Sequence, residues 1–269
     1  MNKKIKGILK RFKLSLNLWY FLPNFIQNNI PQRFIKRTND ELFVLLSKII
    51  KKRQSGLLVI GANDGFSFDD LIPSILKYLS DEQIENNAFF VEPIPYYYEM
   101  LTKNLSPYNS NGCYSLCYNV ALHPTKNSEV IYMVDPALID NKSLPDWLAG
   151  SSSFSYNLLA ITHNLQSNQI LSKQVECVTF DKLMAYIEDY RKVNQFKYNK
   201  LDYLQIDTEG FDDMILDMID YDKYDICIIK FEKVHFSDLK IEEIRMKMSN
   251  YYYCLDFGED EVCIRKNNS

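Results

Sequence analysis

Four consecutive apolar residues, Leu57 to Ile60, lead directly into a short turn that is bounded by Gly61 and Gly65. A continuous apolar run of this kind is typical of a strand buried on both faces, as in a parallel sheet. After the turn, apolar residues recur at spacings of three and four between Ser67 and Leu79, which predicts a helix. A glycine turn between a strand and a helix is where open α/β sheets bind nucleotides, so it predicts both the sheet and a ligand site.

Three later strands are predicted to end on an acidic residue. The apolar segments that begin at residues 88, 201 and 224 end on Glu92, Asp207 and Glu232. Because the carboxyl ends of parallel strands gather at one edge of a sheet, where the ligand binds, we expect these three carboxylates to share one rim. Further strands are predicted over residues 114–122, 130–134 (an edge strand) and 175–179.

The strands alternate with segments of helical periodicity. This alternation predicts an α/β fold with a Rossmann-like, doubly wound, mostly parallel sheet. Two short apolar segments joined around Gly258, residues 251–255 and 261–265, predict a C-terminal antiparallel hairpin.

The first strand separates two parts of the chain. Residues 1–54 are an N-terminal basic helical extension, and residues 55–269 are the main domain. Within the extension, Thr38 caps an apolar helical stripe, and we expect that helix to cover the edge of the sheet. Residues 123–172 break the strand–helix alternation and are rich in loop residues, which predicts an insertion that caps the ligand side of the sheet as a lid.

Charge is unevenly distributed along the chain. Residues 1–53 hold 13 of the 31 Lys and Arg residues but only two of the 35 acidic residues. A main domain this acidic excludes nucleic acid as the principal partner. Residues 1–30 join basic side chains to Trp19, Tyr20 and Phe21. Two placements of this segment are open, namely peripheral contact with an anionic membrane surface and packing as a helix on the domain edge.

No apolar run approaches the length that spans a bilayer. We therefore expect a cytoplasmic protein, with the inner face of the membrane as the place that a basic, aromatic extension would favour. The six cysteines form no C-x-x-C pair and have no zinc spacing. Most of them lie in apolar, strand-like runs, so we expect buried free thiols in a reducing compartment.

The residues of the turn constrain its ligand. Gly61 to Gly65 lack the G-x-G-x-x-G phosphate fingerprint, and Asp64 would repel a pyrophosphate. The charge of Asp64 instead favours the cationic groups of S-adenosylmethionine. Glu92 follows one strand–helix–strand unit later, where a carboxylate accepts hydrogen bonds from both ribose hydroxyls. Asn119 and Ala121, at the end of the predicted strand 114–122, are placed to contact an adenine edge.

Four motifs in this order resemble the FkbM-like methyltransferases. They are Val59–Gly65, Phe90–Pro93, Asn119–Leu122 and Ile206–Gly210. The resemblance implies a class I methyltransferase fold, S-adenosylmethionine as the methyl donor, and O-methylation of a sugar or related hydroxyl on a glycan or small-molecule acceptor.

The resemblance also implies roles for single residues. Gly61, Ala62, Asn63 and Gly65 would cradle the methionine part of the donor, Glu92 would bind the ribose, and Asp207 would lie beside the reacting centre. Members often carry an acid where this chain has Val59, and Asp64 or Asp207 would replace that contact near the amino group of the donor.

Methyl transfer to a hydroxyl requires a group that removes the proton of the acceptor. The candidate bases are Asp207, Glu209, Glu232 and His235, of which His235 titrates nearest neutrality. Asp207 and Glu209 are alternatively ligands for Mg²⁺, together with Asp212. Asp212 has a second interpretation as a charge that complements a helix N-terminus.

Two other function classes remain open. The first is an NAD-type dinucleotide-binding oxidoreductase, against which the missing third glycine and Asp64 count. The second is a catalytically silent Rossmann-like binding module, against which the complete set of donor-site residues counts. The sequence indicates neither the identity of the acceptor nor the oligomeric state.

Overall fold

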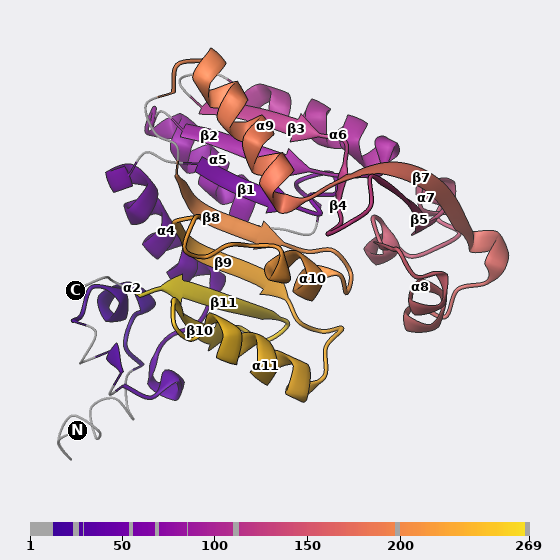
Figure 1. Cartoon of the computed structure of the whole chain (residues 1–269). Helices are drawn as coiled ribbons and strands as arrows, with labels where there is room; N and C mark the ends of the chain where they lie inside the picture. The colour runs from indigo at the N-terminus through magenta and orange to yellow at the C-terminus, as the bar shows by residue number, and fades with distance from the viewer. Residues whose placement is uncertain are drawn as a thin grey trace.

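The computed structural model describes residues 13–23, 27–28, 30–53, 56–67, 70–84, 86–109, 113–196 and 200–266. Its centre is a seven-stranded sheet in the order β10-β11-β9-β8-β1-β2-β3 (Figure 1). The strands are β1 (Gly56–Ile60), β2 (Asn86–Val91), β3 (Cys113–Tyr118), β8 (Leu201–Ile206), β9 (Ile226–Glu232), β10 (Tyr252–Asp256) and β11 (Asp260–Arg265). All neighbours pair in parallel except β9–β11 and β10–β11. This topology confirms the predicted α/β, mostly parallel sheet with a C-terminal hairpin.

Helices cover both faces of the sheet. Alternate residues of β1 point to opposite faces, with Leu57 and Val59 in one apolar core and Leu58 and Ile60 in another. The first core is covered by α2 (Leu16–Tyr20), α4 (Asn39–Arg53), α5 (Leu71–Asp81) and α6 (Pro95–Leu105). The second is covered by α9 (Phe180–Val193), α10 (Asp212–Asp217) and α11 (Asp238–Met248). The sheet is therefore doubly wound.

The expectation that the helix after Thr38 covers the edge of the sheet is wrong. Helix α4 contacts α5 and the central strand β8, so it lies on a face. Its apolar stripe, including Leu42 and Leu46, is fully buried in the same core as Leu57. The physical reason is that a stripe of this width needs a wide apolar surface, which the face of a sheet offers and its edge does not.

The predicted strand 114–122 is two strands in two sheets. After β3 the chain turns, and β4 (Ala121–Leu122) joins a second sheet in the order β4-β7-β5-β6. Asn119 stabilises the break because its side-chain amide donates to the carbonyl oxygens of Glu92 and Pro93, at 2.8 and 3.1 Å. Strand β7 (Ile170–Val178), predicted as residues 175–179, also belongs to this second sheet rather than to the main one.

The insertion at residues 123–172, here called the lid, has regular structure. It contains β5 (Ser128–Val134) and β6 (Ser152–Ser153), the helices α7 (Pro136–Asp140) and α8 (Tyr156–Thr162), and the 3₁₀ helices η3 (Asp146–Leu148) and η4 (Ser167–Gln169). Strand β5 lies between β7 and β6, so the expectation of an edge strand at residues 130–134 is wrong. The lid lies beyond the arrowheads of the parallel strands (Figure 1).

The described part of the N-terminal extension packs on the main domain. Leu14 bridges to Ile35, just after the 3₁₀ helix η1 (Gln32–Phe34), and the ring of Trp19 is buried 5.3 Å from that of Tyr253. Leu18 and Phe21 are exposed. The basic residues before Lys13 lie outside the described residues. Among the residues that are described, no helix is both long enough and apolar enough to cross a membrane.

One cysteine expectation is corrected by the register of the hairpin. Cys254 and Cys263 are directly opposite each other on β10 and β11 and form a disulfide. The expectation of free thiols rested on spacings along the chain and overlooked pairing across a turn centred at Gly258. Cys177 and Cys227 are buried free thiols, as expected, whereas the free thiol of Cys117 is half-buried. The side chain of Cys113 is outside the described part.

A buried ion pair attaches α11 to the sheet. Glu261 on β11 is fully buried, and the Arg245 guanidinium donates to both of its oxygens at 2.7 and 2.8 Å. Lys233 adds a contact at 3.3 Å. Since β11 pairs with β9, this bidentate pair also supports the strand that ends on Glu232.

Replacement of Arg245 by Met is expected to lower the free energy of unfolding by about 3 kcal/mol, because the Glu261 carboxylate stays buried without its main partner. Urea unfolding followed by circular dichroism measures the change. The control is Glu242→Gln, which removes the exposed partner of the same arginine and should change stability by less than about 0.5 kcal/mol. Equal effects of the two substitutions would contradict the role given to Glu261.

Candidate functional site

A cavity of about 780 Å³ lies at the carboxyl edge of the main sheet, between that edge and the lid. The turn after β1, the ends of β2, β8 and β9, and the lid line it. Its lining includes Gly61, Ala62, Asn63, Asp64, Gly65, Glu92, Ala121, Asp207, Glu209, Glu232 and His235. Two predicted site residues are not part of this lining: Asn119, whose amide holds the backbone of the segment after β2, and Asp212, which is fully buried.

The turn after β1 packs closely against the end of β8. Gly61 has a φ of +77°, and a Cβ atom on it would lie 1.7 Å from the carbonyl oxygen of Asp207. The N–H groups of Gly61 and Ala62 both donate to the Val91 carbonyl, and that of Gly65 donates to the Ala62 carbonyl. These amides are therefore not available to cradle a phosphate, which agrees with the missing glycine fingerprint.

Glu92 holds the same turn through backbone hydrogen bonds. Its side chain is buried, and its two oxygens accept the N–H groups of Asn63 at 2.9 Å and Ile94 at 2.8 Å. Burial raises the pKa of this carboxyl to about 7, although both hydrogen bonds lower it. Each oxygen retains a lone pair for a further donor, such as a ribose hydroxyl.

Asp64 and Asn63 have structural contacts that the sequence did not indicate. The Asp64 carboxylate accepts the N–H groups of Phe66 and Ser67 and the hydroxyl of Ser67, so it stabilises the turn itself. The Asn63 amide donates to the carbonyl of Ala149 in the lid at 3.1 Å, while its Oδ1 atom is buried without a hydrogen-bond partner. Asn63 thus joins the turn to the lid and keeps one acceptor for a ligand.

Asp207 lies directly after β8, with its side chain open to the cavity. Its surroundings raise its pKa well above the ordinary value of an Asp carboxyl, first through burial of the group by the surrounding protein. The negative charges of Glu232, Asp212 and Glu209 raise it further, and the charge of Lys230 opposes them. Asp207 is therefore a carboxylate with enhanced basicity beside the turn.

Asp212 connects β8 to β9 instead of merely complementing a helix N-terminus. It is fully buried and accepts the N–H and the hydroxyl of Thr208 at 3.1 and 2.7 Å, and the N–H of Glu232 at 3.2 Å. Burial raises its pKa to about 7. These bonds hold the segments that carry Asp207 and Glu232 in one geometry.

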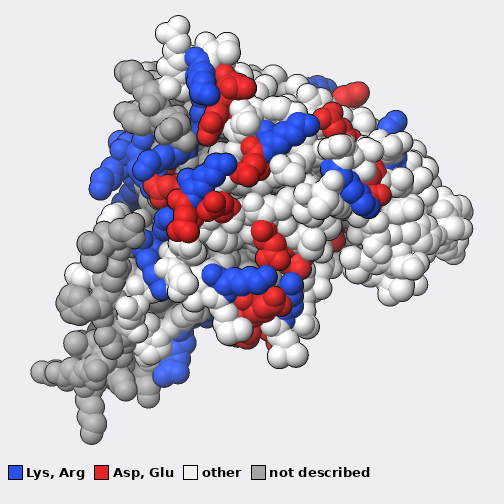
Figure 2. Space-filling model, viewed as in Figure 1, with Lys and Arg blue, Asp and Glu red and all other residues white. Residues whose placement is uncertain are grey.

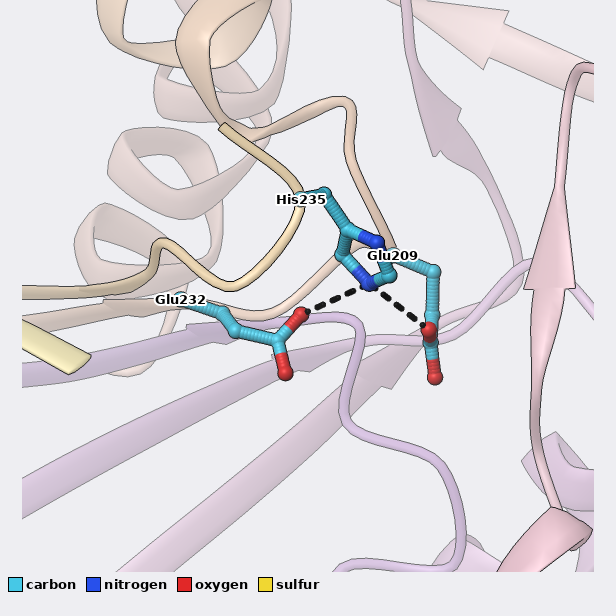
Figure 3. A group of neighbouring side chains, drawn as sticks. All are labelled: Glu209, Glu232 and His235. Atoms are coloured by element: carbon cyan, nitrogen blue, oxygen red, sulfur yellow. Dashed lines mark hydrogen bonds and ion pairs between the residues drawn. The ribbon is translucent and has the colours of Figure 1, made fainter. Parts of the chain in front are cut away.

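Glu209, Glu232 and His235 converge on one point (Figure 3). Nε2 of His235 lies 3.2 Å from Glu209 Oε2 and 3.3 Å from Glu232 Oε2. The hydrogen bond to Glu209, which is the largest cause, and the contact with Glu232 raise the pKa of His235 to about 10, against the lowering effect of burial. The expectation that His235 titrates near neutrality is therefore wrong, because the two carboxylates hold its proton at neutral pH.

The lid contributes residues that the sequence reasoning missed. Trp147, Phe154 and His163 line the cavity, and Trp147 is 60% exposed with its ring centroid 5.8 Å from that of His163. Gly150, which has a φ of +86°, lies so close to Asn63 that a Cβ atom would overlap its amide. The Gly-Ser-Ser-Ser-Phe segment at residues 150–154 was the sequence feature that could have indicated these lid residues. Its contact with Asn63 across the cavity could not be predicted from the sequence.

The comparisons with known proteins concern family and fold. A family model described as the methyltransferase FkbM domain matches residues 60–255, and no curated protein matches the sequence. One similar solved structure is M. capricolum TrmK in complex with S-adenosyl-homocysteine, which is 11% identical with a TM-score of 0.35 and covers 84% of this chain and 68% of that chain. Another is precorrin-6y C5,15-methyltransferase from Geobacter metallireducens GS-15, at 10% identity and a TM-score of 0.32, covering 84% and 88%. Similarities this low carry no argument about function.

The matched span runs from the last residue of β1 into β10 and contains Glu92, Asp207 and Glu232, the three acids at the strand ends. It covers well over half of the chain. Together with the doubly wound sheet, this match confirms the resemblance carried by the four sequence motifs. The chain belongs to the FkbM methyltransferase family.

Proposed function

We propose that this methyltransferase transfers a methyl group from S-adenosylmethionine to a sugar hydroxyl of a glycan, glycolipid or related metabolite. The observation that carries the proposal is the placement of Glu92 and Asp207 on one cavity, directly after β2 and β8. The first is suited to the ribose of the donor and the second to the proton of the acceptor.

The residues of the turn fit the donor. Gly61 and Gly65, both at positive φ, let the turn pack tightly beside Asp207 and Leu101 while it lines the cavity. Glu92 retains acceptor capacity for ribose hydroxyls, and Asn63 Oδ1 is a buried acceptor without a partner. When bound, S-adenosylmethionine supplies an electrophilic methyl group on its sulfonium sulfur.

The lining of the cavity favours a neutral, hydroxylated acceptor. Among the described lining residues, Lys230 is the one Lys or Arg, and it forms an ion pair with Asp260 at 3.0 Å. A phosphate or carboxylate on the acceptor would therefore meet the carboxylates of the rim without a matching basic cluster. The lid instead supplies the rings of Trp147 and Phe154 and the hydroxyls of Ser151–Ser153. On the face of the lid that Figure 2 shows, charged side chains are few.

Asp207 is the residue that we assign as the base. It removes the proton of the acceptor hydroxyl while that oxygen attacks the methyl carbon, so a C–O bond forms as the S–C bond breaks and S-adenosylhomocysteine leaves. The raised pKa of Asp207 makes its ionised form a stronger base than an ordinary carboxylate. His235 is less suited because Nε2 already carries a proton between Glu209 and Glu232.

The alternative of an NAD-type oxidoreductase has less support. A dinucleotide needs backbone N–H groups for its pyrophosphate, whereas those of Gly61, Ala62 and Asn63 donate to Val91 and Glu92. A silent binding module has no use for a carboxylate of raised pKa in the cavity.

Replacement of Glu92 by Gln is expected to weaken binding of S-adenosylhomocysteine by about 10- to 100-fold, because the single amide oxygen cannot accept both the buried N–H groups and the ribose hydroxyls. Isothermal titration calorimetry measures the affinity, and the exposed Glu99→Gln on α6 serves as the control. When the pH is lowered beneath about 7, Glu92 gains a proton, and the affinity of the wild type should decrease by at most about tenfold per pH unit. Unchanged affinity in the Glu92 variant would contradict the ribose assignment.

The acceptor class is tested by transfer of a labelled methyl group to panels of neutral oligosaccharides, sugar phosphates and amines. We expect the label in methyl ethers of the neutral oligosaccharides, which resist alkali and are located by NMR. Label recovered in alkali-labile methyl esters or in methylamines would refute sugar O-methylation while leaving the methyltransferase assignment intact.

Replacement of Asp207 by Asn is expected to slow methyl transfer by about 10²- to 10⁴-fold, since the base is lost while the shape is retained. Affinity for S-adenosylhomocysteine should change by less than about threefold if this residue acts on the acceptor. Single-turnover rates across pH provide the second readout. In the wild type the rate should rise with pH as Asp207 loses its proton, and this rise should occur above the ordinary Asp pKa. The rise should be absent from the pH–rate profile of the variant. If the rate of the variant rose with pH as that of the wild type does, another residue would be the base.

A further inference from the structure

We propose that Glu209, Glu232 and His235 form a binding site for a divalent transition-metal cation of the Mn²⁺ type. One ligand atom from each residue lies within 4.8 Å of the other two. The three side chains come from separate segments, namely the turn after β8, the last residue of β9 and the turn after β9. Figure 3 shows the imidazole Nε2 between the two carboxylates.

The hydrogen bonding of this group is incomplete without a cation. One imidazole N–H has two carboxylate oxygens at almost equal distances, 3.2 and 3.3 Å, and can align well with only one. The bond goes to Glu209. The Oε2 atom of Glu232 is buried, and its contact with Nε2 at 3.3 Å is an ion pair without a well-aligned hydrogen bond. Two carboxylates that share one imidazole N–H in this way fit a metal site before the ion binds.

The charge balance at this corner of the cavity also favours a cation. Asp207, Glu209 and Glu232 line this corner together, and the buried Asp212 lies behind them, where it accepts the N–H of Glu232. The basic residues next along the chain are paired elsewhere, Lys230 with Asp260 and Lys233 with Asp256 and Glu261. A divalent ion would take the place of the His235 proton and bring two positive charges to Glu209 and Glu232.

The donor set selects the class of cation. Carboxylates suit Mn²⁺ as well as Mg²⁺, whereas an imidazole suits transition metals, so the mixed set favours a divalent transition-metal ion over Mg²⁺, which prefers oxygen ligands alone. This set differs from the predicted Mg²⁺ pair Asp207 and Glu209, since it includes His235 and leaves Asp207 outside.

The three ligands line the same cavity as Asp207, so a bound cation keeps coordination positions open toward the acceptor. A diol of a sugar would then bind through two oxygens while Asp207 takes the proton of the reacting one. This role of the cation rests on the proposed methyl transfer, but the existence of the site does not.

The test is a titration of the full-length protein with Mn²⁺, in which the electron paramagnetic resonance signal measures the concentration of the free ion. We expect one Mn²⁺ per chain, and a loss of affinity of at least about tenfold in Glu232→Gln and in His235→Ala, since even outer-shell changes often cost that much. The matched control is Glu259→Gln, an exposed acid that lines the same cavity and is not one of the three. It should bind Mn²⁺ like the wild type.

Binding of S-adenosylhomocysteine to the same samples separates this inference from the proposed function and reports on folding. Normal binding of S-adenosylhomocysteine without stoichiometric Mn²⁺, or with Mn²⁺ bound equally by all variants, would overturn the metal site and leave the methyltransferase proposal standing. If Mn²⁺ bound through the three residues but S-adenosylhomocysteine did not bind, the metal site would stand and the methyltransferase proposal would be overturned. Mg²⁺ bound as tightly as Mn²⁺ would overturn the choice of cation class.

Discussion

The close approach of Gly61 to Asp207 sets the geometry of the whole carboxyl edge. The Asp207 N–H donates to the carbonyl of Ile60, and no side chain fits between the two segments. The first turn of the sheet and the end of β8 are thereby held in contact. Glu92 then fixes the far side of the turn, and Asn63 ties it to the lid. The cavity exists because these contacts place a turn, a lid and three strand ends around one space.

The same geometry brings several carboxylates close together, and backbone N–H groups donate hydrogen bonds to two of them. Glu92 and Asp212 each accept backbone N–H groups, yet burial still raises the pKa of each to about 7. The native state therefore binds these protons more tightly than the unfolded chain does. Their contribution to stability is greatest at low pH and is lost as the pH rises from the ordinary carboxyl range toward 7. A donor that binds the ionised form of Glu92 offsets part of that loss, so donor binding would couple to folding.

Much of this arrangement could be predicted from local patterns. Strands buried on both faces read as continuous apolar runs, and parallel strands have a defined carboxyl end, so the positions of Glu92, Asp207 and Glu232 followed from the sequence. The break at Asn119 did not follow, because it depends on an amide bond to a neighbouring strand that periodicity cannot reveal. The placement of α4 on a face and the Cys254–Cys263 bond are likewise decided by which elements pair, not by the elements themselves.

The sequence by itself determined the class of fold, the family and the strand ends that carry acids, since these depend on residue type and on spacing along the chain. The tertiary structure alone decided what those acids do. It directed Asp64 to its own turn, opened Asp207 to the cavity and placed His235 between Glu209 and Glu232. The reason is that pKa values, orphaned oxygens and ligand geometry arise from groups that are distant in sequence and meet only when the sheet and the lid have formed.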